Sequence, residues 1–125
     1  MRYNVPAQTV ADGETIALPI SQVNSNGDII ASGTDGLILE TGQYLVSFST
    51  DASLQGEGSV GASLALSDVP IPYGVMSTEI AGDNQERLAT TVIINLAGPQ
   101  TLTVLNDTGE TVEYTNSVLT VVKLA

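Results

Sequence analysis

The chain alternates apolar and polar residues in short runs that are separated by glycine, asparagine, aspartate and proline. In residues 43–51, QYLVSFSTD, the side chains of Tyr44, Val46 and Phe48 share one face of an extended chain. Leu45 and two serines occupy the opposite face. This period of two predicts a half-buried β-strand with its aromatic face turned inward.

Further strands are predicted wherever a short β-branched or aliphatic run lies between turn residues: at 15–20, 28–32, 37–40, 60–67, 73–81, 100–106 and 111–115. Asn26-Gly27 favours a tight hairpin, and Gly109 stands where a positive φ is expected. The five prolines, at 6, 19, 70, 72 and 99, are expected on edges, strand ends or turns, because each removes a backbone donor. Helix signals are nearly absent, so the predicted class is all-β, a sandwich or a barrel.

Two segments are apolar on both faces. Residues 86–97 carry Leu88, Val92, Ile94 and Leu96 on one face and Ala89, Ile93 and Ala97 on the other. Residues 117–125 likewise carry Val118, Val122 and Leu124 against Leu119 and Val121. One core cannot cover both sides of a strand in a two-layer protein. We therefore predict that a neighbouring subunit covers the second side.

Residues 1–12 show no clear period, and they fit an edge strand, a flexible arm or a connector. We expect an N-terminal arm or connector at 1–12 and a single domain at 13–125, a size typical of one domain. The apolar residues of the first segment, Tyr3, Val5, Pro6 and Val10, are candidates for insertion into a neighbouring assembly.

Composition excludes several classes of function. The chain has no cysteine, histidine or tryptophan, so it has neither a disulfide scaffold nor a catalytic pair built on histidine. Its net charge of −11 opposes binding to nucleic acid or to an anionic membrane. No apolar run approaches the ~20 residues that cross a bilayer. We expect no enzyme activity and no cofactor.

Three motifs that suggest chemistry have weak sequence contexts. GEGSVG, from Gly56 to Gly61, matches a dinucleotide-binding fingerprint with Glu79 as its acid, but an alternating strand pattern with prolines follows where a helix is needed. Lys123, the only lysine, alternates within the last predicted strand, which favours an exposed residue over a catalytic one. Asn106 begins an N-glycosylation sequon, a pattern that arises easily by chance.

Carboxylates occur in two near pairs, Asp83 with Glu86 and Glu110 with Glu113. They raise the alternatives of glycosidase chemistry and of calcium binding, but turn-rich surroundings favour a solvated face. Calcium remains a minor option, because the loops NSNGD and NDTGE offer oxygen ligands.

Three segments resemble the jelly rolls of the complement-component and tumour-necrosis-factor-like (TNF-like) family. TGQYLVSFSTDAS, with Gly42, Tyr44, Val46 and Phe48 at the pattern positions, resembles one strand of that family. GPQTLTVLN resembles its penultimate strand and NSVLTVVKL its closing strand. The sequence of these segments is most similar to that of the C-terminal domains of bacterial collagen-like surface proteins of the Bacillus exosporium type. The resemblance covers about residues 15–125 by pattern, and it departs from vertebrate members in having few aromatic residues.

The resemblance implies a ten-stranded jelly-roll sandwich that forms a compact homotrimer with the inner sheets on the axis. The expected function is a structural module of an extracellular bacterial cell- or spore-surface fibre or appendage, in which the N-terminal arm links trimers head to tail and a collagen-like stalk is a further partner. The alternative is a ligand-binding tip that recognises a glycan or receptor through loops 51–59, 82–86 and 106–112. The residues expected in the trimer interface and core are Tyr44, Val46, Phe48, Leu88, Val92, Ile93, Ile94, Leu96, Val118, Leu119, Val121, Val122 and Leu124.

Overall fold

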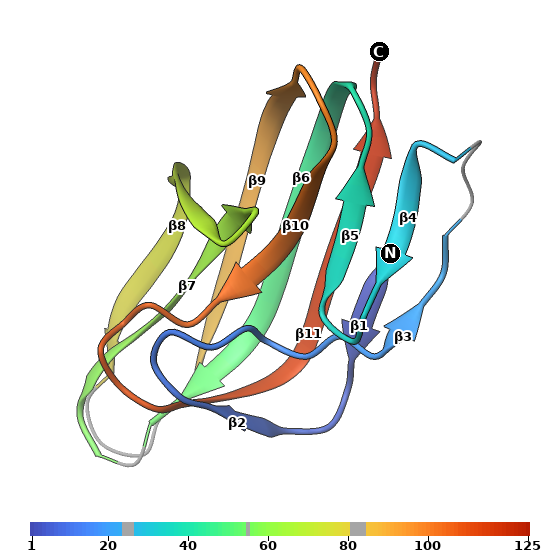
Figure 1. Ribbon diagram of the computed structural model, residues 1–125. Coiled ribbons are helices and arrows are strands. Elements are labelled where there is room, and N and C mark those ends of the chain that lie inside the picture. The colour runs from blue at the N-terminus through green and yellow to red at the C-terminus, as the bar shows by residue number, and fades with distance from the viewer. Residues whose placement is uncertain (24–26, 55, 81–84) are drawn as a thin grey trace.

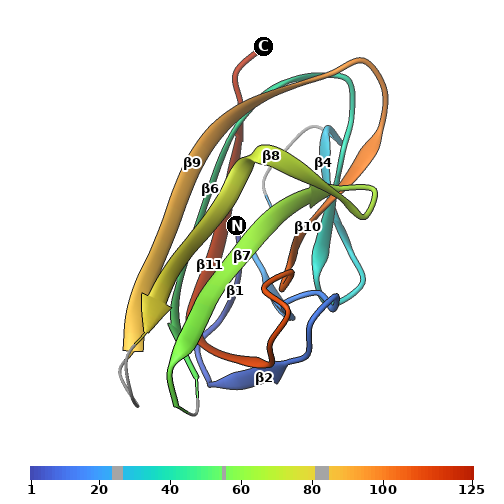
Figure 2. The ribbon, with the colours of Figure 1, turned by 90° about the vertical axis from the view of Figure 1, so that its left-hand side faces the viewer.

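Two antiparallel sheets stacked face to face make up the fold of the computed structural model, which describes residues 1–23, 27–54, 56–80 and 85–125 (Figure 1). Sheet A has the order β3 (Ile20–Ser21), β1 (Arg2–Asn4), β11 (Val112–Lys123), β6 (Gly42–Ser53) and β9 (Gln85–Leu96), and β2 (Gln8–Val10) also pairs with β11. Sheet B has the order β4 (Ile29–Ser32), β5 (Gly36–Leu39), β10 (Gln100–Leu105), β7 (Gly58–Leu66) and β8 (Val69–Ile80). Figure 2 shows the two layers edge on.

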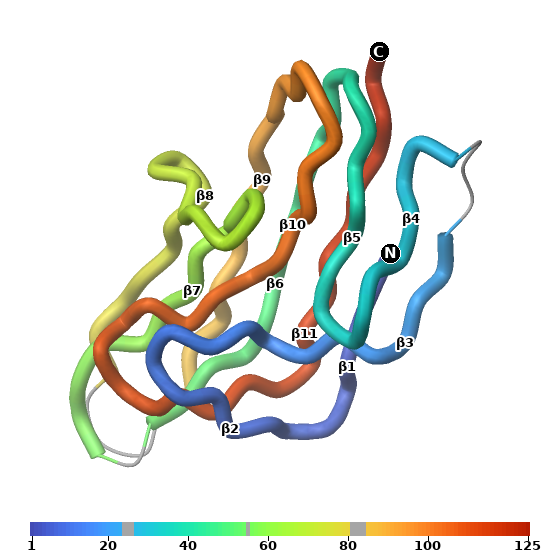
Figure 3. Tube along the Cα trace, viewed as in Figure 1, coloured from blue at the N-terminus to red at the C-terminus, as the bar shows by residue number. Residues whose placement is uncertain are grey.

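The chain crosses repeatedly between the sheets, as in a jelly roll. From β5 in sheet B it passes to β6 in sheet A, returns for β7 and β8, and then alternates through β9, β10 and β11 (Figure 3). The all-β jelly-roll prediction is therefore confirmed. The described residues contain no helix that is long and apolar enough to cross a membrane.

The core lies between the sheets and is built by the alternation seen in the sequence. In β6, Tyr44, Val46 and Phe48 are fully buried, while the residues between them are only partly buried. Tyr114 on β11 reaches across the core, and its hydroxyl donates to the carbonyl oxygen of Gly61 on β7 at 2.6 Å. A buried hydroxyl needs such a partner, so this hydrogen bond ties sheet A to sheet B.

Two strand predictions are wrong in detail. The segments expected as separate strands at 111–115 and 117–125 form one strand, β11, whose register against β6 shifts between Thr115 and Val118. Asn116 stands in this shift with a φ of 53°, a conformation that asparagine tolerates better than most residues. The segment expected as a strand at 15–20 makes only an isolated bridge from Thr15 to Leu105, and regular pairing begins at β3.

The N-terminal segment belongs to the sandwich, contrary to the expected boundary at residue 12. Both β1 and β2 pair with β11, and Val10 is buried in the core. The sequence period is obscured because each strand has only three residues and Pro6 lies between them.

Arg2 fastens this segment to sheet B. Its buried guanidinium donates to the carbonyl oxygens of Ser32 at 2.9 Å, Gly33 at 2.8 Å and Gly36 at 2.6 Å, all at the β4–β5 turn. Charged donors give the stronger hydrogen bonds, so Arg2 holds β1 in place.

The predictions for Gly109, Pro70 and Pro72 are confirmed. Gly109 has a φ of 86°, as expected, and Pro70 and Pro72 lie in β8, an edge strand of sheet B. Asn26, of the expected hairpin, lies outside the described residues.

Candidate functional site

The outer face of sheet A, on the side away from the core, carries two apolar rows that run across the strands. The first row joins Val122 on β11, Leu45 on β6 and Ile93 on β9, which are direct register partners. Ile93 is 52% exposed and Val122 is 48% exposed. Side chains opposite one another on neighbouring strands touch, so these three form one continuous apolar strip.

The second row lies four residues further along β6. It joins Ile20, Tyr3, Val118, Ser49 and Ala89 across five of the six strands of the sheet, and Ser49 is its one polar member. Between the two rows lies a third, polar row made of Thr120, Ser47 and Thr91.

On the described part of this face, charges stand at one border of these rows. There Arg87 pairs with Asp51 at 3.1 Å and also donates to Ser49 Oγ at 2.9 Å. At the opposite border β6 and β9 carry the uncharged Gln43 and Asn95, and Lys123, which pairs with Asp28 at 3.3 Å, lies on the core-facing side of β11. The central part of the face is therefore uncharged, although the chain carries a net charge of −11.

The structure divides the residues expected in the interface and core into two groups. Ile93, Val118 and Val122 lie on the outer face. Leu124 is exposed beyond the end of β11, where its amide donates to the carbonyl oxygen of Gln43 at 2.7 Å. The other nine are buried between the sheets: Tyr44, Val46, Phe48, Leu88, Val92, Ile94, Leu96, Leu119 and Val121.

Sequence reasoning missed three apolar members of the face: Leu45, Tyr3 and Ile20. Leu45 was visible in the alternation as the apolar residue opposite Tyr44, but its serine neighbours made that face read as polar. Tyr3 was assigned to the N-terminal arm and instead pairs with Val118. The other candidates of the arm separate in the structure: Val10 is buried, whereas Val5 and Pro6 are exposed between β1 and β2.

A second apolar surface lies on the flank of the sandwich formed by the edge strand β8. Val69, Tyr73 and Val75 are each at least half exposed. Strands β8 and β9 contact each other and close this flank (Figure 2). Long edge strands with exposed apolar side chains are uncommon in monomers, because they invite pairing or aggregation.

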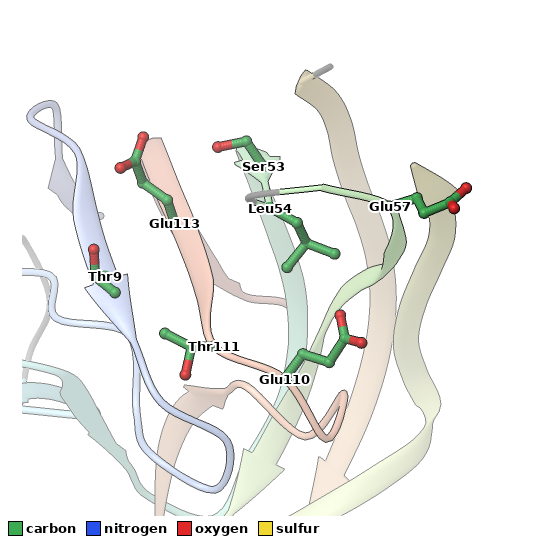
Figure 4. Close-up of a pocket in the computed structure, with 7 residues that line it drawn as sticks. All are labelled: Thr9, Ser53, Leu54, Glu57, Glu110, Thr111 and Glu113. Carbon is green, nitrogen blue, oxygen red and sulfur yellow. The ribbon is translucent and has the colours of Figure 1, made fainter. Parts of the chain in front are cut away.

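An acidic hollow of about 970 Å³ opens at one end of the sandwich, lined by Thr9, Ser53, Leu54, Glu57, Glu110, Thr111 and Glu113 (Figure 4). It brings together the predicted loops 51–59 and 106–112. The three glutamates are exposed. Asp83 and most of loop 82–86 lie outside the described residues, whereas Glu86 is exposed at the start of β9. Among the described residues, no group of three or more histidines, cysteines, aspartates or glutamates is placed to hold a metal ion.

The glycines of GEGSVG have structural roles. The segment leads into β7, with no helix after it. Gly58 has a φ of 154°, and a Cβ on it would lie 2.6 Å from Glu110 Oε2. A Cβ on Gly61 would lie 2.5 Å from the carbonyl oxygen of Met76. These glycines allow close contacts between segments and do not form a phosphate-binding turn.

Asn106, which begins the sequon, also has a structural role. Asn106 is fully buried, and its Nδ2 donates to the carbonyl oxygens of Val10 and Glu110, each at 2.8 Å. Its Oδ1 accepts hydrogen bonds from the backbone and hydroxyl of Thr108. A glycan cannot be attached to this nitrogen in the folded chain.

Comparisons with known proteins identify the fold. No family model matches the chain, and no curated protein matches its sequence. Among solved structures, it is similar to the Eiger TNF of S. frugiperda, with a TM-score of 0.71 and 13% identity over 99% of this chain and 90% of that one. It is also similar to the globular domain of the zebrafish complement 1qA protein, with a TM-score of 0.52 and 13% identity over 90% of this chain and 95% of that one. The chain therefore has the TNF-like jelly-roll fold that the sequence resemblance implied.

Proposed function

We propose that this chain is a non-enzymatic assembly module that forms a homotrimer through the outer face of sheet A. The observation that carries the proposal is the pair of apolar rows on that face, one through Leu45 and one through Tyr3. A sheet that is apolar on both of its faces must be covered on both. The core covers one side, and a second copy covers the other.

The charge distribution permits a second copy at this face. Two chains of net charge −11 repel each other, and the repulsion costs least where the surfaces that meet carry no unpaired carboxylate. The apolar rows meet this condition, because Asp51 lies at their border and is already paired with Arg87.

The two apolar surfaces also fit a ring. An isologous contact of the outer face with itself would make a dimer, whereas a contact between two different surfaces can close a ring. The outer face of sheet A and the flank of β8 are different surfaces on different sides of the sandwich (Figure 2). The TNF-like resemblance supports three copies in that ring.

Residue chemistry supports a function without catalysis. The chain offers neither histidine nor cysteine as a base or nucleophile. A carboxylic acid that donates a proton needs a site shielded from water or a like-charged neighbour held close to it, and Glu57, Glu110 and Glu113 are exposed.

The proposed setting is extracellular, in a fibre or appendage on a bacterial cell or spore, and it rests on the resemblance to collagen-like surface proteins. Head-to-tail linkage through residues 1–12 would require β1 and β2 to leave β11 and pair with another copy. A disulfide between T9C and E113C, which are register partners, would lock β2 in place. Chains that are oxidised as monomers and still form filaments would exclude strand exchange as the link, whereas oxidised monomers that form none would support it.

The acidic hollow supports a second candidate function, a ligand-binding tip. Loops far apart in sequence meet there around Leu54 and three glutamates (Figure 4). A glycan array with and without calcium tests this function. A glycan that binds the native chain but not the E110Q/E113Q variant supports this function, and an array on which no glycan binds the native chain counts against it.

The test of the main proposal is a charge placed in the first apolar row. We predict that I93E reduces the assembly to monomers, because burying an unpaired carboxylate is strongly unfavourable. I30E is the matched control: Ile30 lies on β4 in sheet B and is 46% exposed, close to the 52% of Ile93. Masses are measured by light scattering after gel filtration, with circular dichroism to verify folding. Equal masses for both variants would contradict the proposal.

A further inference from the structure

The outer face of sheet A holds a row of hydroxyl groups enclosed between apolar rows. Thr120 on β11, Ser47 on β6 and Thr91 on β9 are direct register partners. The rows before and after them lie two residues away along each strand, at about 7 Å. A surface that covers both apolar rows must therefore also cover the hydroxyls.

These hydroxyls have little bonding of their own. Thr91 Oγ1 donates to Ser47 Oγ at 3.5 Å, which is the outer limit of a hydrogen bond. No side-chain hydrogen bond of Thr120 is found within the part of the chain that the structure describes. Water satisfies these groups in an isolated chain, but a dry interface removes that water.

We propose that the row of Thr120, Ser47 and Thr91 fixes the register and the number of copies in the assembly. This inference rests on the proposed function, because it requires the face to be covered by a second copy. A hydroxyl that is buried without a partner is penalised, whereas an apolar side chain tolerates many packings. Only arrangements in which hydroxyls meet polar partners across the interface avoid that penalty.

The same logic operates in helical assemblies, where one polar residue in an apolar seam sets the register at some cost in stability. The two apolar rows thus supply most of the attraction, and the hydroxyl row between them selects among the ways in which the rows can meet. Apolar rows alone could slide by two residues along the strands and still bury similar surface.

The test replaces the row by apolar residues of similar size in the full chain, as S47A/T91V/T120V. The control T34V/T41V makes comparable exchanges at two exposed threonines that lie between strands, outside sheet A. Native mass spectrometry across a dilution series measures which masses are present and at what concentration each dissociates.

The expected result is a single mass for the native chain and the control, and at least two assembled masses for the triple variant with no increase in monomer at any dilution. A triple variant with the single native mass would overturn the inference. A triple variant that dissociates more readily than the native chain would also overturn it, because the hydroxyls would then contribute to affinity and not to the choice of arrangement. A native chain that is monomeric throughout would overturn the proposed function and this inference together, so the two failures are distinguishable.

Discussion

Single side chains connect the two sheets, and Tyr114 is the clearest case. It is fully buried, and its hydroxyl donates to Gly61 O at 2.6 Å. Burial raises the pKa of this tyrosine above its ordinary value of 10.0, and the charge of Asp107 raises it further. The buried ring therefore remains neutral in the folded chain at a pH where an exposed tyrosine ionises.

Y114F should change stability in a way that depends on pH. At neutral pH it loses one buried hydrogen bond, which costs about 1 kcal/mol of unfolding free energy. As pH rises past the ordinary value, the unfolded native chain releases the proton of Tyr114 while the folded chain keeps it, so the native protein loses stability. The variant lacks this loss. The difference in unfolding free energy between the native chain and Y114F, measured by urea denaturation, should therefore be smaller at about pH 10.5 than at neutral pH. A difference that stays constant or grows would contradict the raised pKa of Tyr114.

At the scale of elements, alternation predicted the long strands well and the irregular ones poorly. β6 and β9 were expected at 43–51 and 86–97, within two residues of their observed bounds. The shift at Asn116 escaped prediction, because a single residue with positive φ reverses the inward face and splits the period of β11. β1 and β2 escaped because three residues carry too little pattern, and their pairing depends on contacts distant in sequence.

The close approach of β7 and β8 gives a prediction for the glycine motif. G61A should destabilise the fold by about 1–3 kcal/mol, because the new methyl group would overlap the carbonyl oxygen of Met76 on the neighbouring strand. G56A is the control within the motif for steric overlap, since nothing lies within 4 Å of a Cβ there. Its φ of 95° adds backbone strain but no contact. Thermal unfolding measures both, and a G61A variant with native stability would contradict the packing of these strands.

At the scale of the whole molecule, the sequence indicated an assembly but not which residues form its surface. Two doubly apolar segments predicted a covered second face, and Ile93 and Val122 do lie on one outer face together. Alternation correctly turned Tyr44 and Phe48 of β6 toward the core, but sequence reasoning produced one combined set for core and interface and could not separate the two. The acidic hollow brings Glu57 close to Glu110 and Glu113. Glu57 is distant in sequence from the other two, so their proximity depends on loop geometry and no local sequence pattern predicts it.

Burial of the apolar outer face of sheet A between copies of this chain is tested most directly by the mass of the purified native chain in solution. Light scattering over a range of concentrations measures this mass. We predict a discrete mass of three chains that persists on dilution. A monomer at every concentration would contradict it.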